Sequence, residues 1–260
     1  MKRLGGVWPR LVSFENLHAA VDRYQGWARR YAYVLKLDIS RYFPSIDHRL
    51  LKEALRRHLK DARTLSLLDA MIDGSPPAAE PPAYFADDDL LTPLERPRGI
   101  PIGNLTSQFF ANLYLDRFDH GLLDTRKVPA YMRYVDDLYL LGDDLAALWE
   151  LRDACAADLA GERLRLHPRK VRVHRTSEAV DVLGYRVSRT RRWLRNDNGY
   201  RFRRRFRRLL GLYRAGRLGW ADLMPGIQSW IGHARHAETA GLRESIFGPV
   251  AFDRDGWYIR

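Results

Sequence analysis

The hydrophobic and polar residues of the chain follow two patterns, short apolar runs and helical spacing, which predict helices mixed with short strands. The apolar run at 33–39 predicts a buried strand, and Leu50, Leu51, Leu55 and Leu59 then recur at helical spacing. Ser13 is expected to cap a helix that runs to about Arg30. Further helices are predicted over 61–74, 104–118, 144–160, 200–215 and 220–246, and further strands near 171–174, 181–187 and 192–195.

A β-hairpin is predicted at 130–142, because two short apolar strands flank a two-residue acidic turn. Six prolines between 75 and 98 predict a loop there. The order of elements is strand, helices, helix, hairpin, helix and strands. This order predicts an α+β fold, with helices on one face of a mostly antiparallel sheet.

Length and composition narrow the class of protein. The 260 residues suffice for one large domain or two small ones, and 46% hydrophobic with 29% charged residues excludes a disordered or collagen-like chain. No apolar stretch approaches the ~20 residues of a transmembrane helix, and the basic N-terminus lacks the apolar run of a signal peptide. Cys155 is the only cysteine, which excludes intramolecular disulfides and favours a reducing, cytoplasmic location.

The positive charge is concentrated in one segment. The whole chain carries +12, but residues 163–217 hold 19 Lys and Arg against three acids, so the remainder is acidic, at −4. Most of these cations are Arg, whose planar guanidinium suits bidentate phosphate contacts. This favours a nucleic acid as partner over an ordinary solvated helix face or a membrane surface.

Three carboxylates occupy unusual places. Asp38 ends a buried strand, and Asp136 and Asp137 form the tip of the hairpin, although Asp is disfavoured in strands. Clustered carboxylates repel one another, and divalent cations such as Mg²⁺ relieve that repulsion. Acidic pairs are also common in ordinary turns, and 87–89 and 143–144 carry them too, but only the pair at 136–137 follows an aromatic residue between apolar strands.

Five motifs in order make the chain resemble the reverse transcriptases, over nearly its whole length from about His18 onward. They are Asp38-Ile39-Ser40-Arg41-Tyr42-Phe43, Gly99-Ile100-Pro101-Ile102-Gly103-Asn104-Leu105-Thr106-Ser107-Gln108, Tyr134-Val135-Asp136-Asp137, Leu166-His167-Pro168-Arg169-Lys170 and Val182-Leu183-Gly184-Tyr185. The resemblance implies a polymerase palm, a ferredoxin-like antiparallel sheet with helices on one face, followed by a helical thumb. It also implies an RNA-directed DNA polymerase, a nucleotidyltransferase that extends a primer.

The subgroup is indicated by one substitution. Most reverse transcriptases carry Gln where this chain has Ile102, and the string around Ile102 and the tail Ser229-Trp230-Ile231-Gly232-His233-Ala234-Arg235-His236-Ala237 resemble the enzymes of diversity-generating retroelements. Those enzymes copy RNA into mutated cDNA with a small basic accessory protein. Reverse transcriptases associated with CRISPR or defence loci share parts of this pattern and remain an alternative.

The resemblance also assigns roles to residues. It implies two Mg²⁺ ions, with Mn²⁺ as the alternative ion, and as partners an RNA template, a DNA or RNA primer and deoxynucleoside triphosphates. The catalytic residues would be Asp38, Asp136 and Asp137, and the carbonyl of Ile39 would join them as a metal ligand. Nucleotide contacts would come from Phe43, Ile102, Gly103 and Lys170, and template or primer contacts from Ser107, Gln108, Leu183, Gly184, Arg203, Arg204 and Arg207.

Several of these residues have plainer interpretations. Phe43 is either a steric gate against a 2′-hydroxyl or a core residue, and Lys170 is either a proton donor or a simple phosphate contact. Ser107 and Gln108 either touch the template or cap a helix. His233 and His236 are at a spacing that could bind metal, but packing or nucleic-acid contact is favoured because only Glu238 lies near them as a further ligand.

The predicted domains are 1–30 as an N-terminal helix and remnant of fingers, 31–187 as palm and 188–260 as an arginine-rich thumb. Only 37 residues precede Asp38, so most of the fingers region expected from the resemblance is predicted to be missing, with a junction near Leu17 and His18. This leaves a non-catalytic nucleic-acid-binding remnant as an alternative function. A maturase-like protein is a weaker alternative, and an RNase H domain is not expected.

Overall fold

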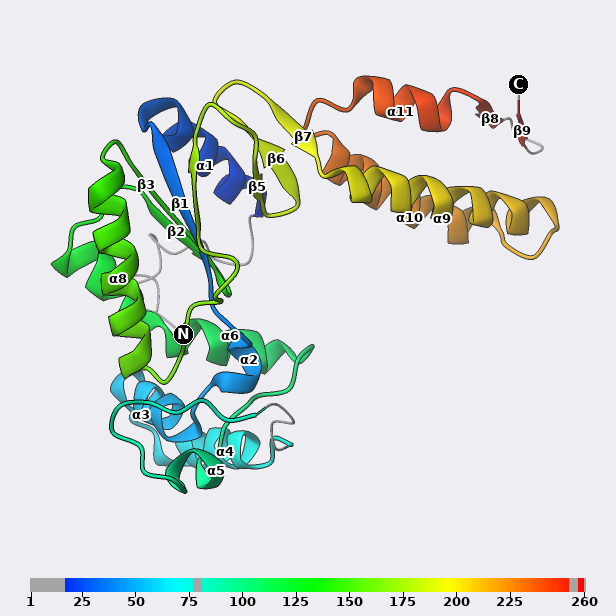
Figure 1. Cartoon of the computed structure of the whole chain (residues 1–260). Helices are drawn as coiled ribbons and strands as arrows, with labels where there is room; N and C mark the ends of the chain where they lie inside the picture. The colour runs from blue at the N-terminus through cyan, green and yellow to red at the C-terminus, as the bar shows by residue number, and fades with distance from the viewer. Residues whose placement is uncertain (1–16, 77–80, 253–256, 260) are drawn as a thin grey trace. The chain divides into compact units, whose positions relative to one another are not determined.

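In the computed structural model the described residues are 17–76, 81–252 and 257–259. They form two compact units, one of 31–175 and one that joins 17–30 to the described residues beyond 175. The first unit holds a four-stranded antiparallel sheet, and the second a three-stranded antiparallel sheet, three C-terminal helices and α1 (Figure 1). Helices combined with antiparallel sheets confirm the predicted α+β fold class.

The sheet of the first unit has the strand order β2-β3-β1-β4, so β1 and β3 are central. Leu35, Leu37, Leu138 and Leu140 on these two strands are fully buried. In chain order the elements of this unit are β1 (Tyr33–Asp38), α2 (Tyr42–Ser45), α3 (His48–His58), α4 (Ala62–Asp73), α5 (Thr92–Glu95), α6 (Leu105–Tyr114), α7 (Asp116–His120), the π-helix η1 (Gly121–Thr125), β2 (Tyr131–Tyr134), β3 (Asp137–Gly142), α8 (Leu145–Gly161) and β4 (Arg172–Arg175).

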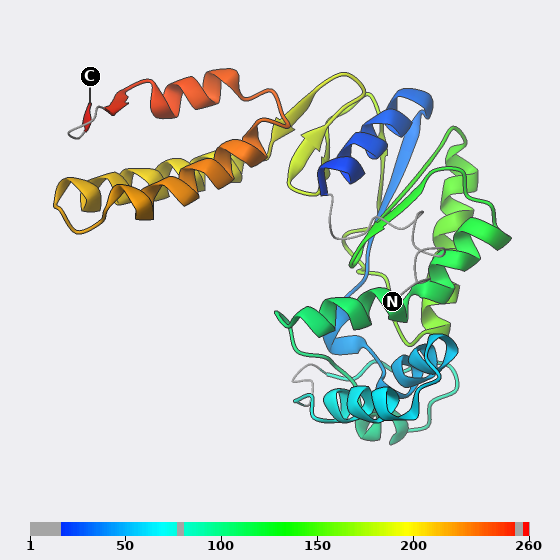
Figure 2. The ribbon, with the colours of Figure 1, turned by 180° about the vertical axis from the view of Figure 1, so that it is seen from behind.

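Helix α8 packs along the sheet against β1 and β3, while α3, α4 and α5 gather beyond the end of β1 (Figures 1 and 2). Cys155 on α8 is fully buried in the core. Burial raises the pKa of its thiol to about 12, so the thiol stays neutral and unreactive. Within the described part of the chain, no helix is long and apolar enough to cross a membrane.

Acidic residues that resemble a catalytic pair in sequence have structural roles instead. Asp144 caps α8 by accepting from the backbone N–H of Ala146 at 2.8 Å, and Asp89 accepts from Thr92 at the start of α5 at 2.7 Å. Asp87 binds the guanidinium of Arg163 through two bonds of 2.5 and 2.6 Å. These contacts tie down the proline-rich segment, which contains the short helix α5 as well as the predicted loop.

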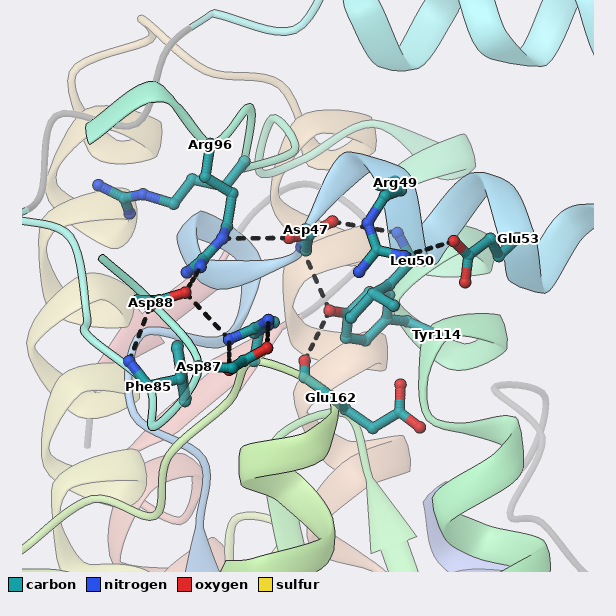
Figure 3. A network of polar contacts seen from close by, with 12 residues as sticks. Asp47, Arg49, Leu50, Glu53, Phe85, Asp87, Asp88, Arg96, Tyr114 and Glu162 are labelled. Carbon is teal, nitrogen blue, oxygen red and sulfur yellow. Dashed lines mark hydrogen bonds and ion pairs between the residues drawn. The ribbon is translucent and has the colours of Figure 1, made fainter. Parts of the chain in front are cut away.

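The proline-rich segment joins a buried network at the start of α3 (Figure 3). Arg96 pairs with Asp88 and also with Asp47, 3.5 Å from its Nε. Asp47 caps α3 by accepting from the N–H of Leu50 at 3.0 Å. The hydroxyl of Tyr114 accepts from the Asp47 N–H and donates to the carbonyl of Glu162, so this network connects α3, α6 and the end of α8.

The second unit gathers α1 with C-terminal elements. Gln25 on α1 donates to the carbonyl of Ser188 at 3.1 Å, and Arg192 donates back to Gln25 and Asp22. The elements are α1 (Leu17–Arg30), β5 (Val180–Val182), β6 (Tyr185–Val187), β7 (Arg192–Leu194), α9 (Asn196–Arg214), α10 (Trp220–Ala234), α11 (Ala240–Phe247), β8 (Val250–Phe252) and β9 (Trp257–Ile259). This division falls at 175–176, whereas the predicted palm runs to 187 and the predicted N-terminal part is separate.

Three predicted elements differ from the structure. The predicted strand at 181–187 is a hairpin, because Leu183 and Gly184 both adopt positive φ in a two-residue turn. The predicted helix at 220–246 breaks after Ala234, whose carbonyl accepts from the hydroxyl of Thr239 at 2.7 Å. The predicted helix over 104–118 ends at Tyr114, and a separate short helix follows. The proposed cap Ser13 lies outside the described residues.

Candidate active site

Two of the three candidate carboxylates lie side by side on the central strands. Asp38 is the last residue of β1, and it faces Asp137, the first residue of β3, in the antiparallel register. Asp136 is in the turn that joins β2 to β3. The predicted hairpin is therefore confirmed, but its two-residue turn is Val135-Asp136 rather than Asp136-Asp137, so Asp137 already lies in β3. The sheet brings together residues that are almost 100 positions apart in sequence.

Backbone hydrogen bonds fix the end of β1 from both sides. The N–H of Ile39 donates to the carbonyl of Asp136 at 3.0 Å, which holds the hairpin turn against β1. On the other side, the N–H of His167 donates to the carbonyl of Asp38 at 2.7 Å. The motifs around 38, 136 and 167 thus meet at one end of the sheet of the first unit. Backbone hydrogen bonds, rather than side-chain contacts, hold these segments together there.

The carboxylates share an electrostatic environment of like charge. Burial raises the pKa of Asp136 above its ordinary value, and the charges of Asp137 and Asp38 raise it further. Burial likewise raises the pKa of Asp137, partly offset by Lys36, whose Nζ lies 3.7 Å from it. The ammonium of Lys170 lies 2.8 Å from Asp38, and this hydrogen bond raises the pKa of Lys170.

The donor chemistry of this edge suits a hard divalent cation. Carboxylate oxygens are the ligands that Mg²⁺ prefers. Two of the three carboxylates already have a positive charge beside them, in the ammonium groups of Lys36 and Lys170. As the side chains lie, however, no group of three acidic, histidine or cysteine residues among those described is placed to hold one metal ion. The assignment of Asp38, Ile39, Asp136 and Asp137 as metal ligands stays a prediction.

The predicted nucleotide-facing segment is bound to the chain that follows β1. The N–H of Ile100 donates to the carbonyl of Phe43 at 3.1 Å, and Gly99 donates to Ile46 at 2.8 Å. Phe43 is half-buried against the core, and Ile102 is 77% exposed. Gly103 adopts a φ of 100°, which a residue with a side chain rarely does, so its glycine is required by backbone conformation.

The two predicted template contacts on α6 differ in exposure. Ser107 is 1% exposed, whereas its neighbour Gln108 is exposed on the surface. The N-cap of α6 is Asn104, where the predicted helix begins, so neither Ser107 nor Gln108 caps the helix. Gln108 is therefore available to a ligand in this conformation, and Ser107 is packed inside the unit.

The remaining predicted contacts lie in the second unit. Leu183 and Gly184 form the tight turn between β5 and β6. On α9, Arg204 and Arg207 are exposed, while Arg203 donates to the hydroxyl of Ser245 at 2.7 Å. The histidines of the tail contact other residues of this unit: the ring of His233 bonds the hydroxyl of Tyr185 at 2.9 Å, and the exposed His236 stacks on His18.

The apolar stripe predicted for the arginine-rich helix is an aromatic cluster. Phe202 stacks on Trp230 of α10 with ring centroids 4.1 Å apart and lies nearly parallel to Phe206, and Phe247 packs edge-on against all three rings. The indole of Trp230 donates to Asn198 at 2.9 Å. This packing leaves the cationic face of α9 directed away from the cluster, since Arg204, Arg207 and Arg208 are exposed.

The sequence analysis did not predict a buried ion pair that joins the hairpin to α7. Arg133 on β2 is 4% exposed and pairs with Asp119 on α7, which is fully buried. The available signal was a single cation inside a short strand of otherwise apolar and aromatic residues. Such a residue is rarely buried without a charged partner.

Comparison with known proteins gives one family match. A family model described as reverse transcriptase (RNA-dependent DNA polymerase) matches residues 4–187. A solved structure of telomerase from Candida albicans, in complex with the TWJ fragment of telomeric RNA, covers 92% of this chain and 45% of that chain, with a TM-score of 0.48 and 12% sequence identity.

Two curated proteins are similar in sequence. Protein YkfC of Escherichia coli (strain K12) is 27% identical over 192 residues, which are 61% of this chain and 48% of that protein. Retron Mx65 reverse transcriptase of Myxococcus xanthus is 32% identical over 169 residues, 60% of this chain and 36% of that protein. This chain thus matches less than half the length of either relative. Because the family model spans residues 4–187, well over half of the sequence, the chain belongs to the reverse transcriptase (RNA-dependent DNA polymerase) family.

Proposed function

We propose that this chain is an RNA-directed DNA polymerase that extends a primer on an RNA template by nucleotidyl transfer. The observation that carries the proposal is the pairing of Asp38 with Asp137 on adjacent strands, with Asp136 on the turn beside them. In a chain of this family, three carboxylates at one strand end are the donor set for two divalent ions that assist phosphoryl transfer. The first unit then corresponds to the palm.

In this proposal the carboxylates bind the metal ions, and Lys170 binds the phosphates of the substrate. Bound Mg²⁺ would supply acidification of the primer 3′-hydroxyl and neutralisation of the leaving pyrophosphate. Asp38 and Asp136 would hold the ions, with Asp137 and the carbonyl of Ile39 beside them. Lys170, on the exposed side of Asp38, is placed to turn from that carboxylate to the phosphates of an incoming nucleotide.

Primer extension tests this proposal. The full chain is incubated with a primer annealed to RNA, four deoxynucleotides and Mg²⁺, and a DNA template of the same sequence runs in parallel. We expect extension on RNA that stops when EDTA is added. Binding of the primer–template without any product would contradict polymerase activity and favour the non-catalytic remnant instead.

We further propose that the enzyme is error-prone, as in diversity-generating retroelements, where a small basic accessory protein would be its partner. Ile102 is 77% exposed on the predicted nucleotide-facing segment and offers no polar group to the nascent base pair. Because discrimination between substrates depends on such polar contacts, Ile102→Gln should lower the misincorporation rate about 3- to 10-fold. Sequencing of cDNA products measures this rate.

The control for this substitution is Leu105→Gln, which adds the same amide at a residue that is 85% exposed on the same segment. It should leave the error rate unchanged. An Ile102→Gln enzyme with as many errors as the wild type would refute the role of Ile102 in fidelity, whatever its overall activity.

The second unit is proposed to bind the phosphates of the primer–template duplex, as a thumb. Removing two exposed cations with Arg204→Gln/Arg207→Gln should reduce the slope of log affinity against log salt by about 1 for each phosphate that is no longer neutralised. Fluorescence anisotropy with a labelled RNA–DNA hybrid at several salt concentrations measures the slope. The charge-matched control is Arg49→Gln/Arg63→Gln, on exposed positions of α3 and α4. An equal change of slope in both variants would contradict a specific role for α9.

A further inference from the structure

Arg133 lies inside the first unit with its whole guanidinium removed from water. It sits on β2, two residues before the hairpin turn, and its side chain is 2% exposed. Nε donates to both carboxylate oxygens of Asp119, at 2.9 and 3.1 Å. Burial by itself lowers the pKa of Arg133, but the charge of Asp119 and its hydrogen bond to Arg133, with smaller contributions from Tyr131 and Tyr42, together outweigh burial and raise the pKa, so the group is a permanent cation.

The other edge of the same guanidinium faces the turn that carries the candidate carboxylate Asp136. Nη1 donates to the carbonyl of Val135 at 3.2 Å and to the side chain of Asn112 at 3.4 Å. Nη2 also donates to the backbone carbonyl of Asn112, on α6, at 3.3 Å. Arg133 thus connects α6 and α7 to the backbone between Tyr134 and Asp136.

The residue that accepts this bond has an unfavourable backbone conformation. Val135 adopts a φ of 57°, in the left-handed region, which is a genuine outlier for a β-branched residue. Such a conformation persists only where the surroundings hold it in place. The next carbonyl along the chain, that of Asp136, is the one that accepts the N–H of Ile39 and joins the turn to β1.

We propose that Arg133 is a positioning residue, which holds Val135 in the left-handed conformation and thereby places Asp136 and Asp137 opposite Asp38. Asp119 and Asn112 fix the guanidinium so that its remaining N–H points at the Val135 carbonyl. The inference rests on the proposed polymerase function only for its kinetic consequence. The geometric consequence, that the turn loosens without Arg133, does not depend on activity.

The test separates this role from a merely structural one. Arg133→Met/Asp119→Asn removes both charges together, so that no unpaired charge is left buried. Adding Val135→Gly to this variant relieves the backbone strain, since glycine adopts positive φ freely. The matched control is Arg126→Met/Asp158→Asn, which removes a half-exposed ion pair of the same unit, bonded at 2.9 Å between the end of η1 and α8.

Amide hydrogen exchange reads the position of the turn directly. In the double variant, we expect the amide of Ile39, which is bonded to Asp136, to exchange about 10-fold faster. The amide of Ser40, which is bonded to the carbonyl of Arg165 at 2.8 Å, serves as the internal reference and should keep its rate. Adding Val135→Gly should restore the protection of Ile39.

Single-nucleotide incorporation gives the second readout. The double variant should lose about 10-fold in kcat, while KM for the deoxynucleotide stays within about 2-fold, and Val135→Gly should recover most of the loss. Unchanged Ile39 exchange in the double variant, or a loss that Val135→Gly fails to recover, would overturn the inference. If even the wild type incorporates no nucleotide, the proposed function fails, but the exchange measurement still decides the role of Arg133.

Discussion

Asp136→Asn is expected to abolish primer extension, with a loss of at least about 1,000-fold in the rate of nucleotide incorporation. The substitution keeps the shape of the side chain and removes the charge on the turn beside Asp38 and Asp137. Burial and two neighbouring carboxylates raise the pKa of Asp136 and disfavour its charged form, so stability does not explain a carboxylate at this position. Rapid-quench measurement of a single incorporation gives the rate.

Affinity for the primer–template should survive the same substitution. Removal of a negative charge from this edge does not weaken attraction to phosphate, so any loss belongs to the chemical step. Asp153→Asn is the matched control, because that carboxylate pairs with Arg152 on α8 and is well exposed. A variant at Asp136 that extends primers at more than a tenth of the wild-type rate, or a control that fails equally, would contradict the assigned role.

Asp119→Ala is expected to have the largest effect on stability, lowering the free energy of unfolding by about 3–5 kcal/mol. The side chains of Asp119 and Arg133 are 0% and 2% exposed, so the substitution leaves the guanidinium buried without its counterion. It also removes the acceptor of the Tyr131 hydroxyl, which donates to Asp119 at 2.5 Å. Urea denaturation followed by circular dichroism measures the change.

Comparison with other variants shows whether the missing counterion is the cause. Arg133→Met/Asp119→Asn should cost clearly less than Asp119→Ala alone, because removing both charges leaves neither unpaired. Asp158→Ala, which breaks the half-exposed pair with Arg126, should cost no more than about 1 kcal/mol. A loss at Asp119 as small as that at Asp158 would show that the pair contributes little to the fold.

The sequence pattern predicted much of the first unit, because most of its helices and strands can be recognised from the residues within each of them. The apolar run before Asp38 and the two runs around Asp136 each satisfy strand periodicity, so the hairpin follows without knowledge of the rest. Helix starts were equally accessible: Asp61 and Asp144 both cap the helices that they precede, at 2.7 and 2.8 Å. The placement of the three candidate carboxylates was predictable for the same reason, since they lie at the ends of recognisable strands.

Features that depend on long-range partners were not predictable in this way. Arg133 can be interpreted only once Asp119 is placed beside it, and no local pattern shows that an arginine in a strand is buried. The pairing of α1 with strands near Ser188 spans more than 150 residues. The turn at Leu183 and Gly184 was not predicted for another reason. Leucine is not a usual residue at positive φ, so this dipeptide did not indicate a turn.

The family match ends at residue 187, so the proposed thumb, which lies beyond it, rests on different evidence from the proposed palm. Its helices beyond 187 are supported as a thumb by the cationic face of α9 and by the aromatic cluster that holds α9, α10 and α11 together. The salt dependence of binding in Arg204→Gln/Arg207→Gln tests this part of the proposal independently of catalysis.

We propose that the strand ends that carry Asp38, Asp136 and Asp137 transfer nucleotides to a primer on RNA. The most direct measurement compares wild type with Asp136→Asn in a single experiment, with RNA template, labelled primer, four deoxynucleotides and Mg²⁺. We expect full-length product with the wild type and none with the variant, at equal affinity for the primer–template. Tight binding by both proteins with product from neither, in Mg²⁺ and in Mn²⁺, would contradict this proposal.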